Sequence, residues 1–246
     1  MPDENSDEIN LGSSVASKIK TIVLSIVVAA LLFLLIFAAS RKPANAEKVW
    51  DEATTIGNIE AKNYYIMYTD IMCPYCDVFS RLTIQYEENF KKFLEENDVL
   101  FELRVTDTLY EGSGIEHSRT SAEGAYCAKR EGKFWDYYHN AVMSLWEDYH
   151  SKGIGDSKTS PMITGMTDEY WHEVGHEVGL GDEFDSCMND HETVDEIEKN
   201  TMKAARITSG AMPYFQFNDF TTSGFDPSWD WNYVLYYLNM GLGEDK

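Results

Sequence analysis

Two cysteines three residues apart, Cys73 and Cys76, are the side chains of this sequence best spaced for covalent chemistry. They enclose a Pro-Tyr dipeptide, and this C-x-x-C spacing lets the two sulfur atoms close a disulfide with each other. The other two cysteines, Cys127 and Cys187, stand far from this pair and from each other in the sequence. A structural zinc ribbon normally uses two C-x-x-C knuckles, and this chain has one. The pair therefore favours redox chemistry over zinc binding.

The residues around the pair predict that it lies at the start of a helix. Residues 64–69 (YYIMYT) form a β-branched and aromatic run that is typical of a buried strand. After the pair, apolar residues recur at helical spacing from Val78 to Leu94, and residues 99–105 (VLFELRV) predict a second strand. The order of strand, C-P-Y-C, helix and strand predicts a βαβ unit with the cysteines at the helix N-terminus.

A helix start is a favourable place for a thiolate. The unpaired backbone N–H groups and the helix macrodipole stabilise an anion there, and Pro74 suits the first turn, where its missing N–H costs nothing. We therefore expect a lowered pKa at Cys73, which makes this sulfur both a nucleophile and a good leaving group. Cys76 lies one turn deeper, where it can close the disulfide and resolve a mixed one.

The remaining sequence predicts a helical block inserted into one sheet domain. Residues 116–205 have helical patterns, interrupted by breaks near residues 132, 153–165 and 181. The block is followed by a strand, an edge strand and a closing helix, at residues 213–217, 220–225 and 229–240. Two αβ pieces thus flank a block of helices.

A second motif offers a different chemistry. His172, Glu173, His176 and Asp182 spell H-E-x-x-H-x-x-G-x-x-D, in which two histidines on one helix face can bind zinc, with the glutamate as base and the aspartate as third ligand. This predicts a zinc-dependent metalloprotease as an alternative function. However, the apolar residues of the same helix form a stripe that leaves the histidines on its flank, as on an ordinary amphipathic helix. The protease interpretation also explains neither C-P-Y-C nor the strand order, so the favoured prediction has no metal.

An apolar segment precedes the domain. Residues 21–39 (TIVLSIVVAALLFLLIFAA) carry no charge and are long enough to cross a bilayer as one helix. A cleaved signal peptide is the alternative, because residues 44–46 (ANA) resemble a cleavage site, although such peptides usually have an apolar stretch of only about 7–15 residues. We predict a polar tail over residues 1–20, a transmembrane signal anchor over 21–39, a linker over 40–57 and a folded domain over 58–246.

The cysteines decide the expected orientation of this anchor. Lysine and arginine residues flank the span on both sides, so loop charge does not distinguish the two orientations. An even number of cysteines behind a membrane span suits an oxidising compartment. We therefore expect a single-pass cell-membrane protein whose domain is extracytoplasmic.

The net charge of −22 excludes whole classes of partner. Residues 1–46 carry four basic and four acidic side chains, so the other 200 residues hold 16 basic and 38 acidic ones. Such a surface repels phosphate backbones, which excludes nucleic-acid binding. Solubility is the simplest reason for this acidity, and a site for a cationic partner is the alternative.

The C-P-Y-C segment resembles the active-site segment of the DsbA-like thiol–disulfide oxidoreductases of the thioredoxin superfamily. The likeness extends over about residues 58–240 and is carried by segments 68–79 (YTDIMCPYCDVF), 117–128, 131–135, 179–188 and 210–215 (GAMPYF). Glutaredoxins share the C-P-Y-C tetrapeptide, but the inserted helices and the apolar N-terminal segment argue against that smaller fold. The resemblance implies an α/β thioredoxin fold with a helical insertion at about residues 108–205.

The resemblance also implies roles for single residues. Cys73 would be the attacking cysteine and Cys76 the resolving one, with Pro74 and Tyr75 between them tuning the redox poise.

The loop before the last strands carries the other part of the implied site. Pro213 would be the family's cis-proline facing the cysteines, and the backbone of Met212 would receive the substrate strand. Many relatives have Thr or Val before this proline, so Met212 is a departure that bears on substrate preference. Some relatives join two insertion helices by a disulfide, which makes a Cys127–Cys187 bond the favoured pairing and two buried free thiols the alternative.

The function implied by the resemblance is disulfide exchange with cysteine-containing protein substrates. The redox-active disulfide would be the only cofactor, and a membrane redox partner would recycle it. The sequence leaves open whether the chain acts as oxidase, reductase or isomerase. A non-catalytic, membrane-anchored binding protein that reuses the thioredoxin fold is a further alternative.

Overall fold

The structure, a computed structural model, describes residues 50–243 apart from residues 168, 209 and 210, together with Val23 and Ile26. The chain divides into two units, Met1–Val49 and Trp50–Lys246, and the second unit carries the fold. Within the described residues, no helix combines the length and the apolar character that crossing a membrane requires. The predicted tail and transmembrane helix lie outside the described residues, except for Val23 and Ile26, and so does the linker up to residue 49.

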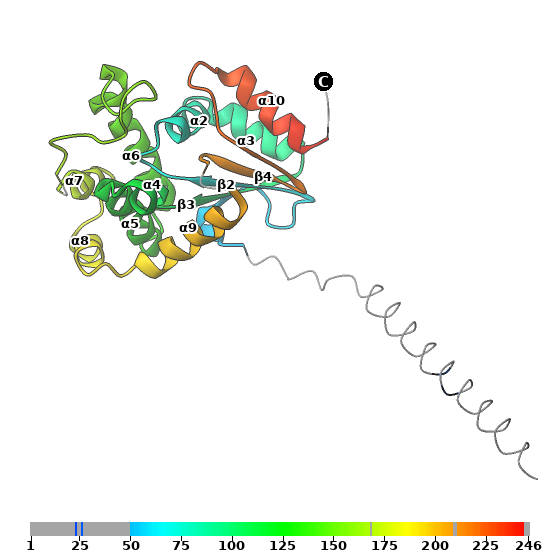
Figure 1. Cartoon of the computed structure of the whole chain (residues 1–246), viewed down its shortest axis with the longest axis horizontal. Helices are drawn as coiled ribbons and strands as arrows, with labels where there is room; N and C mark the ends of the chain where they lie inside the picture. Colours follow the sequence, from blue (N-terminus) through cyan, green and yellow to red (C-terminus); the bar gives the residue numbers. More distant parts are fainter. Residues whose placement is uncertain (1–22, 24–25, 27–49, 168, 209–210, 244–246) are drawn as a thin grey trace, which may run out of the picture. The chain divides into compact units, whose positions relative to one another are not determined.

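Within the described residues, one five-stranded sheet forms the centre of the second unit (Figure 1). The order is β1-β3-β2-β4-β5, in which β2 lies between the parallel strand β3 and the antiparallel strand β4. The strands are β1 (Thr55–Ile56), β2 (Asn63–Thr69), β3 (Val99–Val105), β4 (Tyr214–Phe217) and β5 (Phe220–Ser223). The strands predicted from the aromatic and β-branched runs are therefore confirmed, with small shifts at their ends.

Helices cover both faces of the sheet. Figure 1 shows α2 (Pro74–Gln85), α3 (Glu87–Glu96) and α10 (Trp231–Gly241) on one side, and α9 (Val194–Thr208) on the other. The helical pattern that runs from Val78 to Leu94 forms two helices rather than one, because the chain leaves helical geometry at Tyr86. The connection from β2 to β3 is thus the predicted βαβ crossover with a break in its helix.

The segment between β3 and β4 is the predicted helical insertion. It contains α4 (Thr108–Ser113), α5 (Glu116–Arg130), α6 (Phe134–Asp148), η2 (His150–Lys152), α7 (Glu169–Glu177), α8 (Asp182–Asn189) and α9. Several of its large side chains, Tyr137, Trp171 and Phe184 among them, are fully buried and join the core of the sheet domain in one cluster. The α/β architecture with a helical insertion is confirmed.

The predicted domain boundary is wrong at its N-terminal side. Residues 50–57 were expected to be linker, but they pack on the domain. Thr55 and Ile56 form β1 and pair with β3, the Trp50 ring lies 5.7 Å from the ring of Tyr64, and Asp51 forms an ion pair with Lys129 at 2.8 Å. A strand of two residues is too short to show an alternating pattern, so sequence periodicity could not detect it.

Replacing Gly175 of α7 with alanine is expected to lower the free energy of unfolding by about 1–3 kcal/mol. A Cβ at this position would lie 2.3 Å from Cε1 of Phe184, whose ring is fully buried and cannot move without disturbing its neighbours. Urea unfolding of the full chain, followed by circular dichroism, measures the effect. Gly112→Ala in α4 is the control, because a Cβ there meets no atom within 4 Å. Equal unfolding midpoints for the two variants would contradict the packing argument.

Candidate active site

The structure places the cysteine pair at the start of α2, as predicted. Cys73 is the N-cap residue and Pro74 the first residue of the helix, and the Cys73 carbonyl accepts the hydrogen bond from the Asp77 N–H at 3.0 Å. Both sulfur atoms are free thiols. The exposed fraction is 5% for Cys73 and 1% for Cys76, so Cys73 is the more accessible of two buried residues.

Burial governs the protonation of Cys76. Burial raises the pKa of the Cys76 thiol well above its usual value, and its hydrogen bond to the Cys73 sulfur and the nearby charge of Asp70 raise it further. Cys76 therefore holds its proton in the folded chain.

A buried carboxylate, Asp70, organises the loop that carries the pair. Its Oδ1 accepts a hydrogen bond from the Met72 N–H at 2.9 Å, and its Oδ2 accepts from the Leu109 N–H at 2.8 Å and the Ser118 hydroxyl at 2.7 Å. Its carbonyl also accepts from the Cys73 N–H at 3.0 Å. Asp70 thus ties the cysteine loop to helices α4 and α5 of the insertion. Sequence reasoning missed this residue, and its only signal was a charged side chain at the end of a buried strand.

Ionisation of Asp70 is expected to cost stability as the pH rises. Burial raises the pKa of this carboxyl from 3.8 to about 6, although its three hydrogen bonds act in the opposite direction. The folded state therefore holds the proton more tightly than the unfolded state, and the contribution of Asp70 falls between pH 4 and pH 7 by about 3 kcal/mol. The measurement is the difference in urea unfolding between the parent and Asp70→Asn across this range. A difference that does not change with pH would contradict the shifted pKa.

Met212 and Pro213 lie at the same end of the sheet as the cysteines. The Met212–Pro213 peptide bond is cis, and β4 begins at the next residue. Tyr214 pairs with Tyr68 of β2, so the antiparallel register brings Pro213 beside the last residue of β2, where the loop to Cys73 begins. Pro213 is buried, and Met212 is half-buried against the small cluster that includes Tyr68 and Tyr214.

The remaining residue of the predicted site, Tyr75, is exposed on the first turn of α2. Its hydroxyl lies 3.5 Å from the Ser157 carbonyl oxygen, a long contact with the loop that follows η2. Tyr75 is therefore at the surface, whereas the neighbouring Pro74 is buried.

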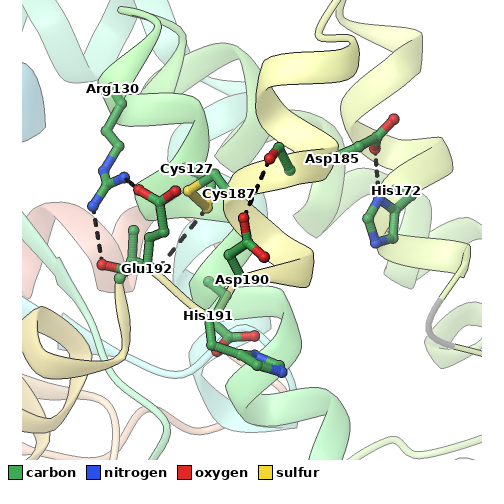
Figure 2. Close-up of a disulfide and its surroundings, with 11 residues drawn as sticks. Cys127, Arg130, His172, Asp185, Cys187, Asp190, His191 and Glu192 are labelled. Atoms are coloured by element: carbon green, nitrogen blue, oxygen red, sulfur yellow. Dashed lines mark hydrogen bonds and ion pairs between the residues drawn. A yellow bond between two sulfur atoms is a disulfide. The ribbon is translucent and has the colours of Figure 1, made fainter.

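Cys127 and Cys187 are joined by a disulfide that links α5 to α8 (Figure 2). The two Cα atoms are 5.8 Å apart, and the bond joins residues that are 60 positions apart in the sequence. This is the pairing implied by the family resemblance, and the alternative of two free thiols does not hold. Arg130 of α5 also pairs with Glu192, which follows α8, so the bond lies in a wider contact between the two segments.

The two histidines of the H-E-x-x-H motif contact Asp185, and not Asp182 as the motif spacing predicts. His172 Nδ1 lies 2.5 Å and His176 Nε2 2.9 Å from the carboxylate of Asp185, whereas Glu173 and Asp182 are exposed. Partial burial opposes ionisation of Asp185, but the hydrogen bonds from the two histidines lower its pKa. Within the described residues, no group of three or more His, Cys, Asp or Glu is arranged to hold a metal ion. The alternative in which Asp182 is the third zinc ligand does not fit this arrangement, because Asp185 of α8, and not Asp182, lies against the histidines.

Several solved structures share this fold. The thiol-disulfide exchange protein alpha-DsbA2 from Wolbachia pipientis is 16% identical with a TM-score of 0.52, over 76% of this chain and 85% of that one. The thioredoxin-like oxidoreductase from Silicibacter pomeroyi DSS-3 is 17% identical with a TM-score of 0.54, over 79% and 95% of the two chains. The disulfide bond oxidoreductase DsbG from Mycobacterium tuberculosis is 18% identical with a TM-score of 0.53, over 78% and 88%. Because the sequence identities to these structures are low, the structural similarity establishes the shared fold and nothing further.

The sequence itself gives the family. No curated protein matches this chain. The family model described as thioredoxin matches residues 51–223, which is more than half of the chain and includes both cysteines of the pair, the insertion and Pro213. The family match and the fold agree in their extent, and this chain therefore belongs to the thioredoxin family.

Proposed function

We propose that this protein is an enzyme that exchanges disulfides with cysteine-containing protein substrates through Cys73 and Cys76. The observation that carries the proposal is the pair of free thiols at the start of α2, in which Cys73 is the more accessible sulfur and Cys76 is almost fully buried one turn deeper. The thioredoxin family match and the fold shared with DsbA- and DsbG-type proteins support it.

As an oxidase, the chain starts with a Cys73–Cys76 disulfide. A substrate thiolate attacks the Cys73 sulfur, the bond between the cysteines breaks, and Cys76 leaves as a thiolate that takes up a proton. A second substrate thiolate then attacks the substrate sulfur of the mixed disulfide and releases Cys73. The substrate loses two electrons and the cysteine pair gains them. As a reductase, Cys73 attacks a substrate disulfide and Cys76 resolves the mixed disulfide.

Met212 and Pro213 are proposed to hold the substrate. Their loop lies at the sheet end where the cysteine loop begins, and Met212 is only half-buried. A substrate segment that pairs with the Met212 backbone would therefore run close to Cys73. No cofactor beyond the redox-active disulfide is part of the proposal.

Residues 21–39 are proposed to anchor the enzyme in the cell membrane with its domain outside the cytoplasm. The uncharged length of this segment and the Cys127–Cys187 disulfide support this location, where a membrane redox partner would recycle the pair. Washing membranes with alkaline carbonate should leave the protein in the membrane fraction, and a membrane-impermeant thiol reagent should label Cys73 in intact cells. Release by the wash, or labelling only after lysis, would contradict the location.

Trapping of mixed disulfides tests the proposed activity. In a Cys76→Ser variant the resolving thiol is missing, so complexes between Cys73 and substrate proteins should accumulate and dissolve on reduction. The double variant Cys73→Ser/Cys76→Ser is the control and should trap nothing. Absence of complexes from the single variant would favour the non-catalytic binding protein.

A further inference from the structure

A cavity of about 350 Å³ opens beside the first turn of α2. Pro74, which follows Cys73, forms part of its wall, and so does Asp77, which lies one helical turn beyond Cys73 on the same face. Trp146 of α6 and His150 of η2 line it from the insertion. Its volume is in the range of ligand-binding sites, and it lies directly beside the cysteine that reacts.

Two polar side chains in this cavity are buried without full pairing. Asp77 is 3% and His150 is 4% exposed, and Nδ1 of His150 lies 3.4 Å from Oδ2 of Asp77. Oδ1 of Asp77 and both ring nitrogens of His150 have no hydrogen-bond partner among the residues that the structure describes. A proton on Nδ1, the nitrogen that faces the carboxylate, leaves Nε2 as an acceptor. The two side chains that line the cavity then hold two buried acceptors that lack donors.

The basic side chains of the cavity do not supply these donors. The Arg81 guanidinium lies 4.0 Å from the centre of the Trp146 ring, and its Nε forms a long ion pair of 3.9 Å with Oδ2 of Asp77 but no hydrogen bond to either carboxylate oxygen. Lys158 lies on an exposed loop at the rim, next to the turn made by Asp156. The buried Oδ1 of Asp77 therefore receives no donor from these two side chains.

We propose that this cavity binds a basic side chain, lysine or arginine, that a protein substrate carries near the cysteine that reacts with Cys73. An ammonium or guanidinium group brings several N–H donors and a positive charge, which gives strong hydrogen bonds to a carboxylate. The net charge of −22 also attracts cationic segments toward the domain. The inference rests on the proposed disulfide exchange and adds the substrate feature that this site selects.

Short peptides with a single cysteine test the inference. The full chain, with Cys73 and Cys76 oxidised, is mixed with peptides that carry lysine, arginine or the uncharged norleucine at each position around the cysteine. The rate of mixed-disulfide formation is followed by acid quench and mass spectrometry. At one or two positions, lysine or arginine should raise this rate about tenfold over norleucine.

Substitutions in the cavity should remove this preference. Asp77→Asn should bring the lysine-to-norleucine rate ratio close to one, and His150→Gln should lower it. Asp219→Asn is the matched control. Asp219 is an exposed carboxylate that follows the C-terminal end of β4, whereas Pro213 precedes its N-terminal end. This variant should keep the parent's lysine-to-norleucine rate ratio. Each ratio compares two peptides on the same variant, so a change in overall activity does not affect it.

Two results would overturn the inference alone. These are equal rates for lysine, arginine and norleucine peptides at every position, or a preference that Asp77→Asn retains. Absence of exchange with every peptide would overturn the proposed function, and the inference with it.

Discussion

Replacing Cys73 with serine is expected to lower the rate of disulfide exchange by at least about a thousandfold. A serine hydroxyl does not attack disulfides and cannot be attacked as a disulfide sulfur, so neither direction of exchange has a first step. Cys76 cannot take over, because it is almost fully buried and its thiol has a pKa well above the usual value. Oxidation of a peptide with two thiols and reduction of insulin measure the two directions.

The variant Cys76→Ser separates the roles of the two sulfur atoms. It keeps the first attack by Cys73 on a substrate disulfide but should stall as a mixed disulfide, because the resolving thiol is missing. In the reduced parent, iodoacetamide should label Cys73 before Cys76, in line with their exposure. Parent-level exchange by Cys73→Ser, or faster labelling of Cys76, would show that the assigned roles are wrong.

Removal of the second disulfide is expected to affect stability rather than exchange. The double variant Cys127→Ala/Cys187→Ala should lose about 4 kcal/mol of unfolding free energy, because the bond restricts a loop of 60 residues in the unfolded chain. Both residues are buried, so lost packing adds to this effect. Urea unfolding of the full chain under non-reducing conditions gives the value.

The control for this measurement is Cys73→Ser/Cys76→Ser, which keeps the Cys127–Cys187 bond. It should unfold at a denaturant concentration close to that of the parent. A loss below about 1 kcal/mol in the Cys127→Ala/Cys187→Ala protein would contradict a stabilising role for the bond.

The sequence predicted those parts of the fold whose signal is local. Strands β2 and β3 are rich in aromatic, aliphatic and β-branched residues because both faces of a central sheet are buried, and such segments can be recognised without a structure. The position of Cys73 at a helix start followed from a strand, a proline and an apolar helical pattern around it. The helical pattern of residues 116–205 was recognised in the same way.

The parts that could not be predicted depend on contacts between distant residues. Asp70 and its partner Ser118 are 48 residues apart, and Asp77 and His150 are brought together only by packing of α2 against the insertion. The choice of Asp185 rather than Asp182 depends on the angle at which α8 meets α7, which motif spacing does not encode. The two-residue strand β1 is defined only by its pairing with β3.

A redox titration of the full chain tests the central claim most directly. The protein is equilibrated in buffers of graded thiol–disulfide potential, free thiols are alkylated, and the modified cysteines are counted by mass spectrometry. We predict one two-electron transition in which Cys73 and Cys76 form their disulfide together, while Cys127–Cys187 stays oxidised over the same range. If Cys73 and Cys76 remained two thiols at every potential, or if only Cys127 and Cys187 responded, the account would be contradicted.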